Sequence, residues 1–137
     1  MDSHGTWEVT LKFNLLIINL KGSFNVEGVI ELQNHIKKVV LDNKLTSWNR
    51  LEIYAEGALA TLDAIMAIIE HQTCYEAYGC IYVGVICHDS IQQYLIKQLV
   101  IENLIIFNSL VQAEKYLLNA NELDKSGWLV SNGVLQY

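Results

Sequence analysis

Strand-like apolar runs alternate with helical patterns four times along this chain. Each run ends in a turn and leads into a capped, amphipathic segment. The runs lie at residues 15–20, 51–55, 81–86 and 104–107, and the helices after them begin near Asn25, Ala60, Asp89 and Ser109. Such alternation is typical of layered folds in which a crossover helix returns the chain to a parallel strand. We therefore expect an α/β domain with a mixed, mostly parallel sheet of about five strands and about four helices.

Two local patterns refine this expectation. Residues 7–13 alternate apolar and polar side chains, which predicts a strand with one face in water. Only Asn14 separates this segment from the next apolar run, so the two strands should form a tight, antiparallel hairpin. Residues 46–49, Thr-Ser-Trp-Asn, indicate a polar turn that carries one aromatic side chain.

Helix starts and inner faces can also be read from spacing. Asp89 and Ser109 each stand three residues before a glutamine, as in a capping box, where the cap oxygen and the glutamine side chain satisfy free backbone amides. Asn25 is a good N-cap for the first helix. The expected inner faces are Val29, Leu32, Ile36 and Val39 in the first helix, and Leu62, Ile65, Met66 and Ile69 in the second.

Composition argues against several classes of protein. Hydrophobic residues make up 52% of the 137 and charged residues 18%, which is typical of a folded domain with a large core. The net charge of −6 and the scattered Lys and Arg residues argue against a nucleic-acid partner. No apolar stretch approaches the roughly 18–20 residues of a membrane span, and the N-terminus lacks the pattern of a secretory signal.

Cysteine and proline usage bears on compartment and organisation. Three cysteines without a Cys-x-x-Cys pair suit a reducing compartment, so we expect a cytoplasmic protein without a disulfide framework. The chain contains no proline and hence no stiff linker. We expect one domain at residues 1–120 and a C-terminal tail at 121–137 that packs on the domain or on a partner.

Four short pieces of the chain carry a resemblance to a known family. They are residues 21–28, 50–57, 83–85 and 106–113. Together with the order of elements over residues 15–118, they resemble the STAS-like domains of the bacterial anti-sigma-factor antagonists. The chain looks most similar to a small uncharacterised bacterial branch, which shares its fold with lipid-transfer CRAL-TRIO domains. The resemblance implies a domain that binds a protein partner or a second copy of itself, or that carries a lipid.

The chain departs from this family at the family's best-known switch. Regulatory members have an Asp-Ser-Ser-Gly type motif at the start of the second helix, where a partner kinase phosphorylates a serine. Here Asp63 matches the acidic residue, but Ala64 and Ile65 stand where serines are expected. Thr61 is the nearest hydroxyl, and a phosphate at a helix N-terminus is physically favourable. A plain N-cap is the favoured interpretation of Thr61.

The carboxyl edge of the sheet is where a ligand or partner should bind, because open parallel sheets bind ligands beyond the carboxyl ends of their strands. The turn after the third strand lies at the centre of that edge, and its small residues leave backbone amides accessible. The predicted partner-binding residues are Glu56, Gly57, Ala58, Leu59, Ala60, Thr61 and Asp63. A ligand at the same edge would meet Ser23, Phe24, Asn25, His88 and Asn108.

The sequence Cys87-His88-Asp89 suggests a nucleophile with its base, but a simpler interpretation is favoured. Neighbouring residues of a strand point to opposite faces, so the Cys87 and His88 side chains should diverge. Asp89 already serves as a helix cap. We expect a buried structural cysteine beside an exposed histidine.

A metal or cofactor site is not expected. His71, Cys74 and Cys80 could approach one another, but without a metal-ligand signature core cysteines are favoured. The eight glycines are dispersed and form no phosphate-binding loop. Glu52 alternates with core residues on its strand and should lie on the wetter face.

Three functions remain open from the sequence. The first is a non-catalytic protein-interaction or regulatory module, in which Trp48 and Trp128 would form an exposed apolar patch for a partner. The second is a carrier of a lipid or other small apolar ligand, held beneath the second and third helices. The third is a small enzyme, for which no acid, base or nucleophile geometry emerges.

Overall fold

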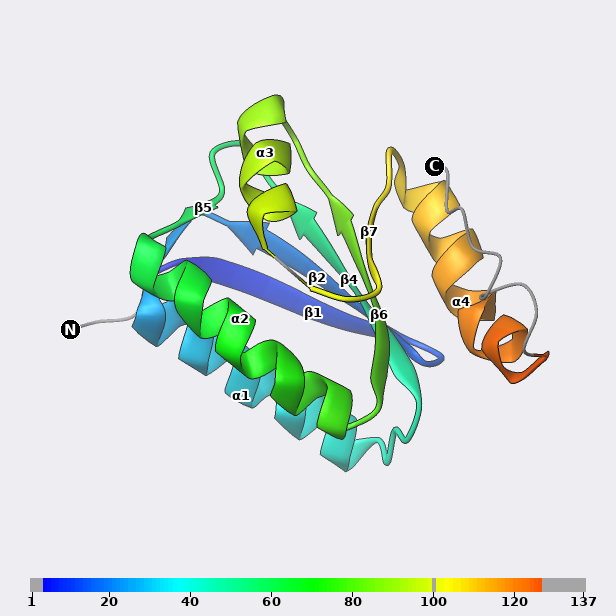
Figure 1. Ribbon diagram of the computed structural model, residues 1–137. Coiled ribbons are helices and arrows are strands. Elements are labelled where there is room, and N and C mark those ends of the chain that lie inside the picture. Colours follow the sequence, from blue (N-terminus) through cyan, green and yellow to red (C-terminus); the bar gives the residue numbers. More distant parts are fainter. Residues whose placement is uncertain (1–3, 100, 127–137) are drawn as a thin grey trace.

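Five strands of this computed structural model, which describes residues 4–99 and 101–126, form a single sheet. In sheet order they are β1 (Thr6–Lys12), β2 (Leu15–Lys21), β4 (Trp48–Tyr54), β6 (Cys80–Ile86) and β7 (Leu104–Ile106). β1 is antiparallel to β2, and the other three pairings are parallel. The predicted α/β domain with a mixed, mostly parallel sheet is confirmed (Figure 1).

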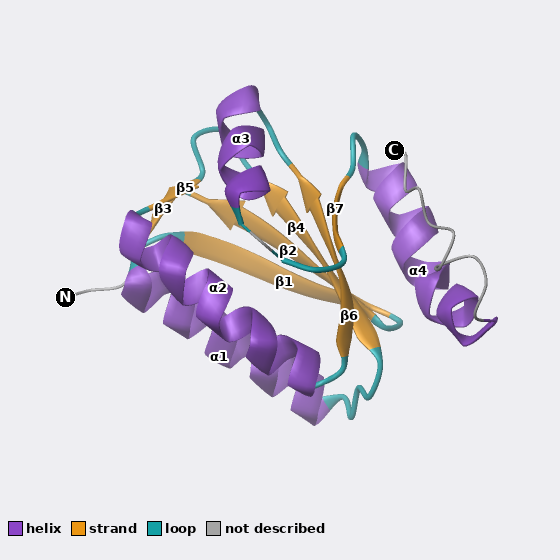
Figure 2. Ribbon diagram, in the orientation of Figure 1, coloured by secondary structure: helices purple, strands orange, loops and turns teal. Residues whose placement is uncertain are grey.

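Four helices among the described residues cover the two faces of this sheet. They are α1 (Val26–Asp42), α2 (Leu62–Ala77), α3 (Ser90–Gln98) and α4 (Leu110–Ser126). α1 and α2 lie side by side on one face, whereas α4 packs against β2, β4 and β6 from the other (Figure 2). A separate two-stranded parallel sheet, β3 (Ser23–Phe24) with β5 (Leu59–Ala60), lies beside the start of α2. Among the described residues, no helix combines the length and apolar character that crossing a bilayer would require.

The sheet divides the hydrophobic core into two layers, because successive side chains of a strand point to opposite faces. The layer under α1 and α2 includes Leu16, Ile18, Trp48, Val83 and Val85. The layer under α4 includes Leu15, Ile17, Leu51, Phe107 and Leu117. Neighbouring residues of β2 therefore belong to different layers, and the strand is buried on both sides, as a central strand of such a fold must be.

The hairpin and the N-cap hydrogen bonds form as the sequence predicts, but the Asp89 capping box is not reciprocal, because Gln92 Oε1 accepts from the His88 amide instead of the Asp89 amide. Lys12 pairs with Leu15 across the β1–β2 turn, in which Phe13 adopts the left-handed conformation with φ of +56°. Side-chain oxygens accept hydrogen bonds from the amide three residues on at each helix start: Asn25 from Gly28, Thr61 from Ala64, Asp89 from Gln92 and Ser109 from Gln112. Each cap satisfies an amide that has no partner within its own helix.

The predicted turn at residues 46–49 is wrong in its second half: residues 46–47 form a bend, but β4 begins at Trp48, three residues earlier than expected. Trp48 and Asn49 read as polar-turn residues, but both are buried. The Trp48 indole nitrogen donates to the backbone oxygen of Tyr78 at 2.9 Å. A polar group can enter a strand when the protein supplies its hydrogen bond, and Trp48 is therefore core rather than an exposed patch.

The inner face predicted for α2 is partly wrong. Met66 is 57% exposed, and the small residues Ala64 and Ala67 are buried in its place. Small side chains at a contact let two elements approach closely, which fits α2 lying against α1. The side chains of Leu62, Ile65 and Ile69 lie outside the described ones.

The predicted tail begins inside a helix, since α4 continues to Ser126. Residues 127–137, including Trp128, lie outside the described residues. The packing of this segment on the domain or on a partner stays a prediction.

Candidate functional site

A pocket lies between the sheet and the three helices α1, α2 and α3, and encloses a cavity of about 80 Å³. Its walls are mostly apolar. They include Leu20 from β2, Val29 and Ile36 from α1, Ile68 from α2 and Ile96 from α3. Apolar side chains from four separate elements thus converge on one space, which is the usual form of a small-molecule site.

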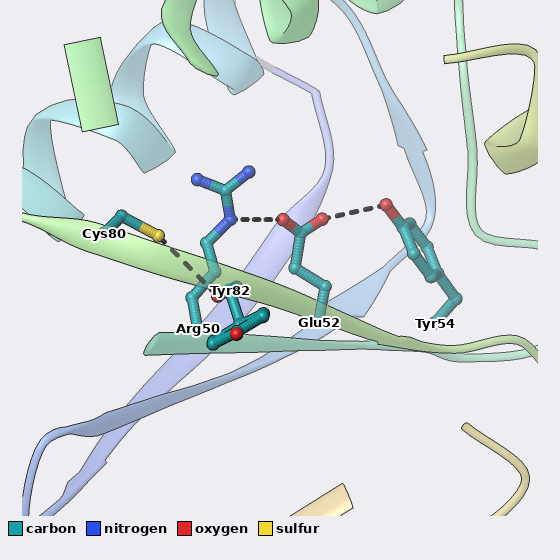
Figure 3. Close-up of polar contacts among 5 residues, drawn as sticks. All are labelled: Arg50, Glu52, Tyr54, Cys80 and Tyr82. Atoms are coloured by element: carbon teal, nitrogen blue, oxygen red, sulfur yellow. Dashed lines mark hydrogen bonds and ion pairs between the residues drawn. The ribbon is translucent and has the colours of Figure 1, made fainter. Parts of the chain in front are cut away.

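Three polar side chains of β4, Arg50, Glu52 and Tyr54, line the same pocket. They stand two residues apart, so all three leave the strand on the face that α1 and α2 cover, as Figure 3 shows. Arg50 Nε donates to Glu52 Oε2 at 2.8 Å, and the Tyr54 hydroxyl donates to Glu52 Oε1 at 2.9 Å. Both oxygens of one carboxylate are therefore held by side chains of the same strand.

Arg50 is the most deeply buried charge of the site, with 1% of its surface exposed. Its guanidinium lies over the ring of Tyr75, 4.2 Å from the centroid, which is a favourable cation–π geometry. Burial is the largest influence on the pKa of Arg50 and would lower it, but Glu52, Cys80 and Tyr75 together outweigh burial and the pKa is raised. Burial, and secondarily Glu52, also hold the pKa of the Tyr54 hydroxyl well above its usual value. Both groups keep their protons at neutral pH.

Two glutamine side chains complete the polar lining, and they differ in their hydrogen bonds. Gln92 in α3 is buried; its amide nitrogen donates to the backbone oxygens of Ala55 at 2.8 Å and Ala58 at 3.1 Å. These two bonds join α3 to the segment that follows β4. The side-chain oxygen of Gln92 accepts from the His88 amide, just before α3, at 2.6 Å. In contrast, the buried Oε1 of Gln33 in α1 has no hydrogen-bond partner in the described part of the chain.

The predicted partner-binding segment, residues 56–63, borders this pocket. Ala58 is buried and Ala60 is half-buried, and both line the pocket from within. Residues that instead face outward are Glu56, Gly57, Thr61 and Asp63. Leu59 joins Ala60 in β5, and its side chain is not among those described. The segment therefore has an inner side toward the cavity and an outer side toward solvent, and partner binding there stays a prediction.

The residues predicted for a ligand at the carboxyl edge do not gather at one place. Phe24 is buried and lines the pocket. Asn25 Oδ1 accepts hydrogen bonds from the amides of His4 and Gly28, so it serves as a cap. Ser23, His88 and Asn108 are exposed and do not line the pocket.

The sequence did not reveal that Arg50, Glu52 and Tyr54 of β4 line one pocket. The expected position of Glu52 on the solvent-facing side of the strand is wrong. The Glu52 side chain is only 15% exposed, because it lies under the helices beside Arg50. A signal was present in the sequence: opposite charges at positions 50 and 52, followed by a tyrosine at 54, share one face of a strand.

The cysteines offer no reactive centre among the described side chains. Cys80 is buried, its Sγ lies 3.7 Å from the backbone oxygen of Tyr82, and burial raises its pKa to about 11. Cys87 is half-buried, and burial followed by the nearby Asp89 raises its pKa. The side chains of His71 and Cys74 lie outside the description. Within the described residues, no three His, Cys, Asp or Glu side chains are placed to hold a metal ion.

Comparison with solved structures identifies the fold. An uncharacterised protein of the DUF3478 family with a SpoIIAA-like fold, from Shewanella loihica PV-4, is similar over 85% of this chain and 98% of its own, with a TM-score of 0.61 and 12% identity. The anti-sigma factor antagonist SpoIIAA is similar over 88% of this chain and 97% of its own, with a TM-score of 0.54 and 10% identity. No protein-family model and no curated protein matches the sequence. The chain has the SpoIIAA-like, or STAS, fold, as its sequence predicts.

Proposed function

We propose that this chain, with its SpoIIAA-like fold, is a non-catalytic binding module that takes up a small, largely apolar ligand between its sheet and α1, α2 and α3. One observation carries the proposal: a cavity of about 80 Å³ whose walls are apolar and which Arg50, Glu52 and Tyr54 line from β4. Apolar walls supply most of the binding free energy of small molecules, and a few polar groups orient them.

The size of the cavity limits the part of a ligand that it encloses. One water-sized group needs roughly 10–15 Å³ of such space, so the cavity has room for roughly five to eight of them. A short alkyl chain or a small ring with one polar group has this size. A longer lipid would place only its end in the cavity.

The Arg50 guanidinium and the Tyr54 phenol are suited to binding rather than to proton transfer. Arg50 and Tyr54 keep their protons at neutral pH, since the pKa of each is raised. Both groups hydrogen-bond to the same Glu52 carboxylate, which fixes its position. A general base should titrate near the working pH, and neither the guanidinium nor the phenol does so.

Native mass spectrometry of protein purified without detergent tests this proposal, alone and with added short-chain ligands. Ala60 lines the cavity, so Ala60→Leu adds three carbons to its wall and should abolish uptake while the fold persists. Ala77→Leu is the matched control, because Ala77 is exposed near the end of α2. A bare polypeptide mass for the unmodified protein under every condition would contradict the proposal, as would unchanged uptake by Ala60→Leu.

A protein partner is the second candidate, supported by the outward side of residues 56–63. Glu56, Gly57, Thr61 and Asp63 are exposed there, and SpoIIAA, which has the same fold, is an anti-sigma factor antagonist. Gly57→Trp should block association because no atom lies within 4 Å of a Cβ built at Gly57, so the indole would project outward. Pull-down from a bacterial lysate and size-exclusion chromatography, each with and without the substitution, check this. A partner or dimer retained equally by Gly57→Trp would contradict it.

A further inference from the structure

We propose that the ligand of this pocket carries an uncharged polar head with a hydrogen-bond donor, such as an alcohol or a primary amide, and donates to Gln33 Oε1. This inference rests on the proposed ligand-binding function and names the chemical class of its ligand. It follows from two features of the pocket, the Gln33 acceptor and the charge balance of the Arg50–Glu52 pair.

Gln33 lines the pocket from α1, between the turns that carry Val29 and Ile36. Its Oε1 is buried and has no hydrogen-bond partner in the part of the chain that the structure describes. Buried amide oxygens nearly always accept a hydrogen bond, and one that does not is costly. The other glutamine of the pocket, Gln92, has its side-chain oxygen and nitrogen engaged by the backbone. A ligand that donates at Gln33 would complete the lining.

The charges of the pocket favour a neutral ligand. Arg50 and Glu52 form an ion pair at 2.8 Å, with 2% and 15% of their side chains exposed, so their charges nearly cancel. A carboxylate ligand would bring a second negative charge beside Glu52, and an ammonium would bring a second positive charge beside Arg50. Either would leave a buried net charge, which is far more costly to desolvate than a hydroxyl or amide.

Four six-carbon probes separate these possibilities at neutral pH: hexanol, hexanamide, hexanoate and hexylammonium. Each has about the size that the cavity accommodates. Two-dimensional amide NMR follows each titration, and the side-chain amide of Gln33 and the Nε–H of Arg50 report from inside the pocket. We expect hexanol and hexanamide to bind at least about tenfold more tightly than either charged probe.

Substitution of the acceptor tests the role of Gln33. Gln33→Leu should weaken hexanol binding by about three- to tenfold, the loss expected for one hydrogen bond, and should not weaken hexanoate binding. Gln33→Met, unbranched and of similar length, provides a second folded variant. Asn34→Leu is the matched control, because Asn34 is exposed on the same helix. Unchanged hexanol affinity in both Gln33 variants would overturn the inference.

The outcomes distinguish this inference from the function on which it rests. Tighter binding of hexanoate or hexylammonium than of hexanol would overturn the neutral head and leave the ligand-binding function in place. The absence of any saturable shift at the pocket residues with all four probes would overturn both.

Discussion

The two faces of the sheet differ in how completely side chains fill the space between the sheet and the helices. Under α4, both the nitrogen and the oxygen of the Asn49 side chain make hydrogen bonds: Nδ2 donates to the Leu117 oxygen at 2.7 Å, and Oδ1 accepts from the Tyr82 amide at 3.0 Å. Gly84 leaves no spare room there, since a Cβ would lie 2.7 Å from Leu117 Cδ1. Under α1, α2 and α3, a cavity remains and Gln33 Oε1 has no partner among the described residues.

One strand contributes to both faces, which makes the difference instructive. Asn49 and Leu51 of β4 lie in the filled layer under α4, whereas Arg50 and Glu52 line the cavity. A core needs no buried ion pair for stability, because apolar residues of similar volume serve as well or better. The unfilled face therefore carries polar side chains that stability alone does not require, which supports placing the proposed ligand there.

The largest expected effect comes from breaking the ion pair on the unfilled face. Glu52→Gln leaves the buried Arg50 guanidinium without its counter-charge and should lower the free energy of unfolding by about 3–5 kcal/mol. Urea denaturation measures this loss. The double variant Arg50→Met/Glu52→Leu, which removes both charges, should be more stable than Glu52→Gln alone. A single variant as stable as the unmodified protein would show that the pair is solvated.

Adding carbon atoms to each face tests the packing contrast directly. Gly84→Val places three carbons against Leu117, Phe107 and Leu51 and should cost roughly 2–3 kcal/mol. Ala60→Leu also adds three carbons, but toward the cavity, and should cost less than about 1 kcal/mol. Thermal and urea unfolding of both variants provide the comparison. Equal losses would show that the two faces are equally filled.

High pH should weaken the cavity-side layer, to which Cys80 belongs. The unfolded chain releases the Cys80 proton near pH 9.0, whereas the folded protein keeps it up to about pH 11. Above pH 9 the unfolded state therefore binds fewer protons, and stability falls as pH rises. The loss between pH 9 and 10.5 should be about 1–2 kcal/mol, measured by urea denaturation at each pH. Cys80→Ala should flatten this dependence; an unchanged slope would assign it to other groups, such as Tyr54.

At the outer side of residues 56–63, a substitution should change association with a partner and have only a modest effect on stability. Gly57 has φ of +74°, so Gly57→Trp should cost only about 1–2 kcal/mol in backbone strain. Hexanol binding should persist while partner association is lost. Lys44→Trp is the matched control, because Lys44 is exposed with φ of +53° and follows α1 at its far end. Loss of hexanol binding in Gly57→Trp alone would show that the outer and inner sides of the segment are not separate.

Local sequence signals predicted the fold well because they act over a few residues. The Asn25, Asp89 and Ser109 caps each satisfy an amide three residues away, and the β1–β2 turn joins adjacent strands. The order of these elements then limited the topology to the SpoIIAA-like arrangement that the solved structures share.

The pocket was harder to predict because its polarity depends on contacts between distant segments. The sequence places Glu52 on the water-facing side of its strand because it does not show that α1 and α2 cover this side chain. The contact between the Arg50 guanidinium and Tyr75 likewise joins two separate elements, β4 and α2. Gln33 is unremarkable in an amphipathic helix, and only the cavity beside it shows that its oxygen has no donor among the described residues. Met66 likewise has the spacing of the inner helix face, but it is exposed in the packed arrangement of α2 against α1.

Intermolecular nuclear Overhauser effects between hexanol and the methyl groups of isotopically labelled protein show which face of the sheet takes up the ligand. We expect contacts from hexanol to the methyls of Ile36, Ala58 and Ala60, which line the cavity under α1, α2 and α3. We expect no contacts to Ala113 or Leu117, which lie in the filled layer under α4. Contacts confined to the α4 layer, or none to the three cavity methyls at saturating hexanol, would contradict ligand binding in this cavity.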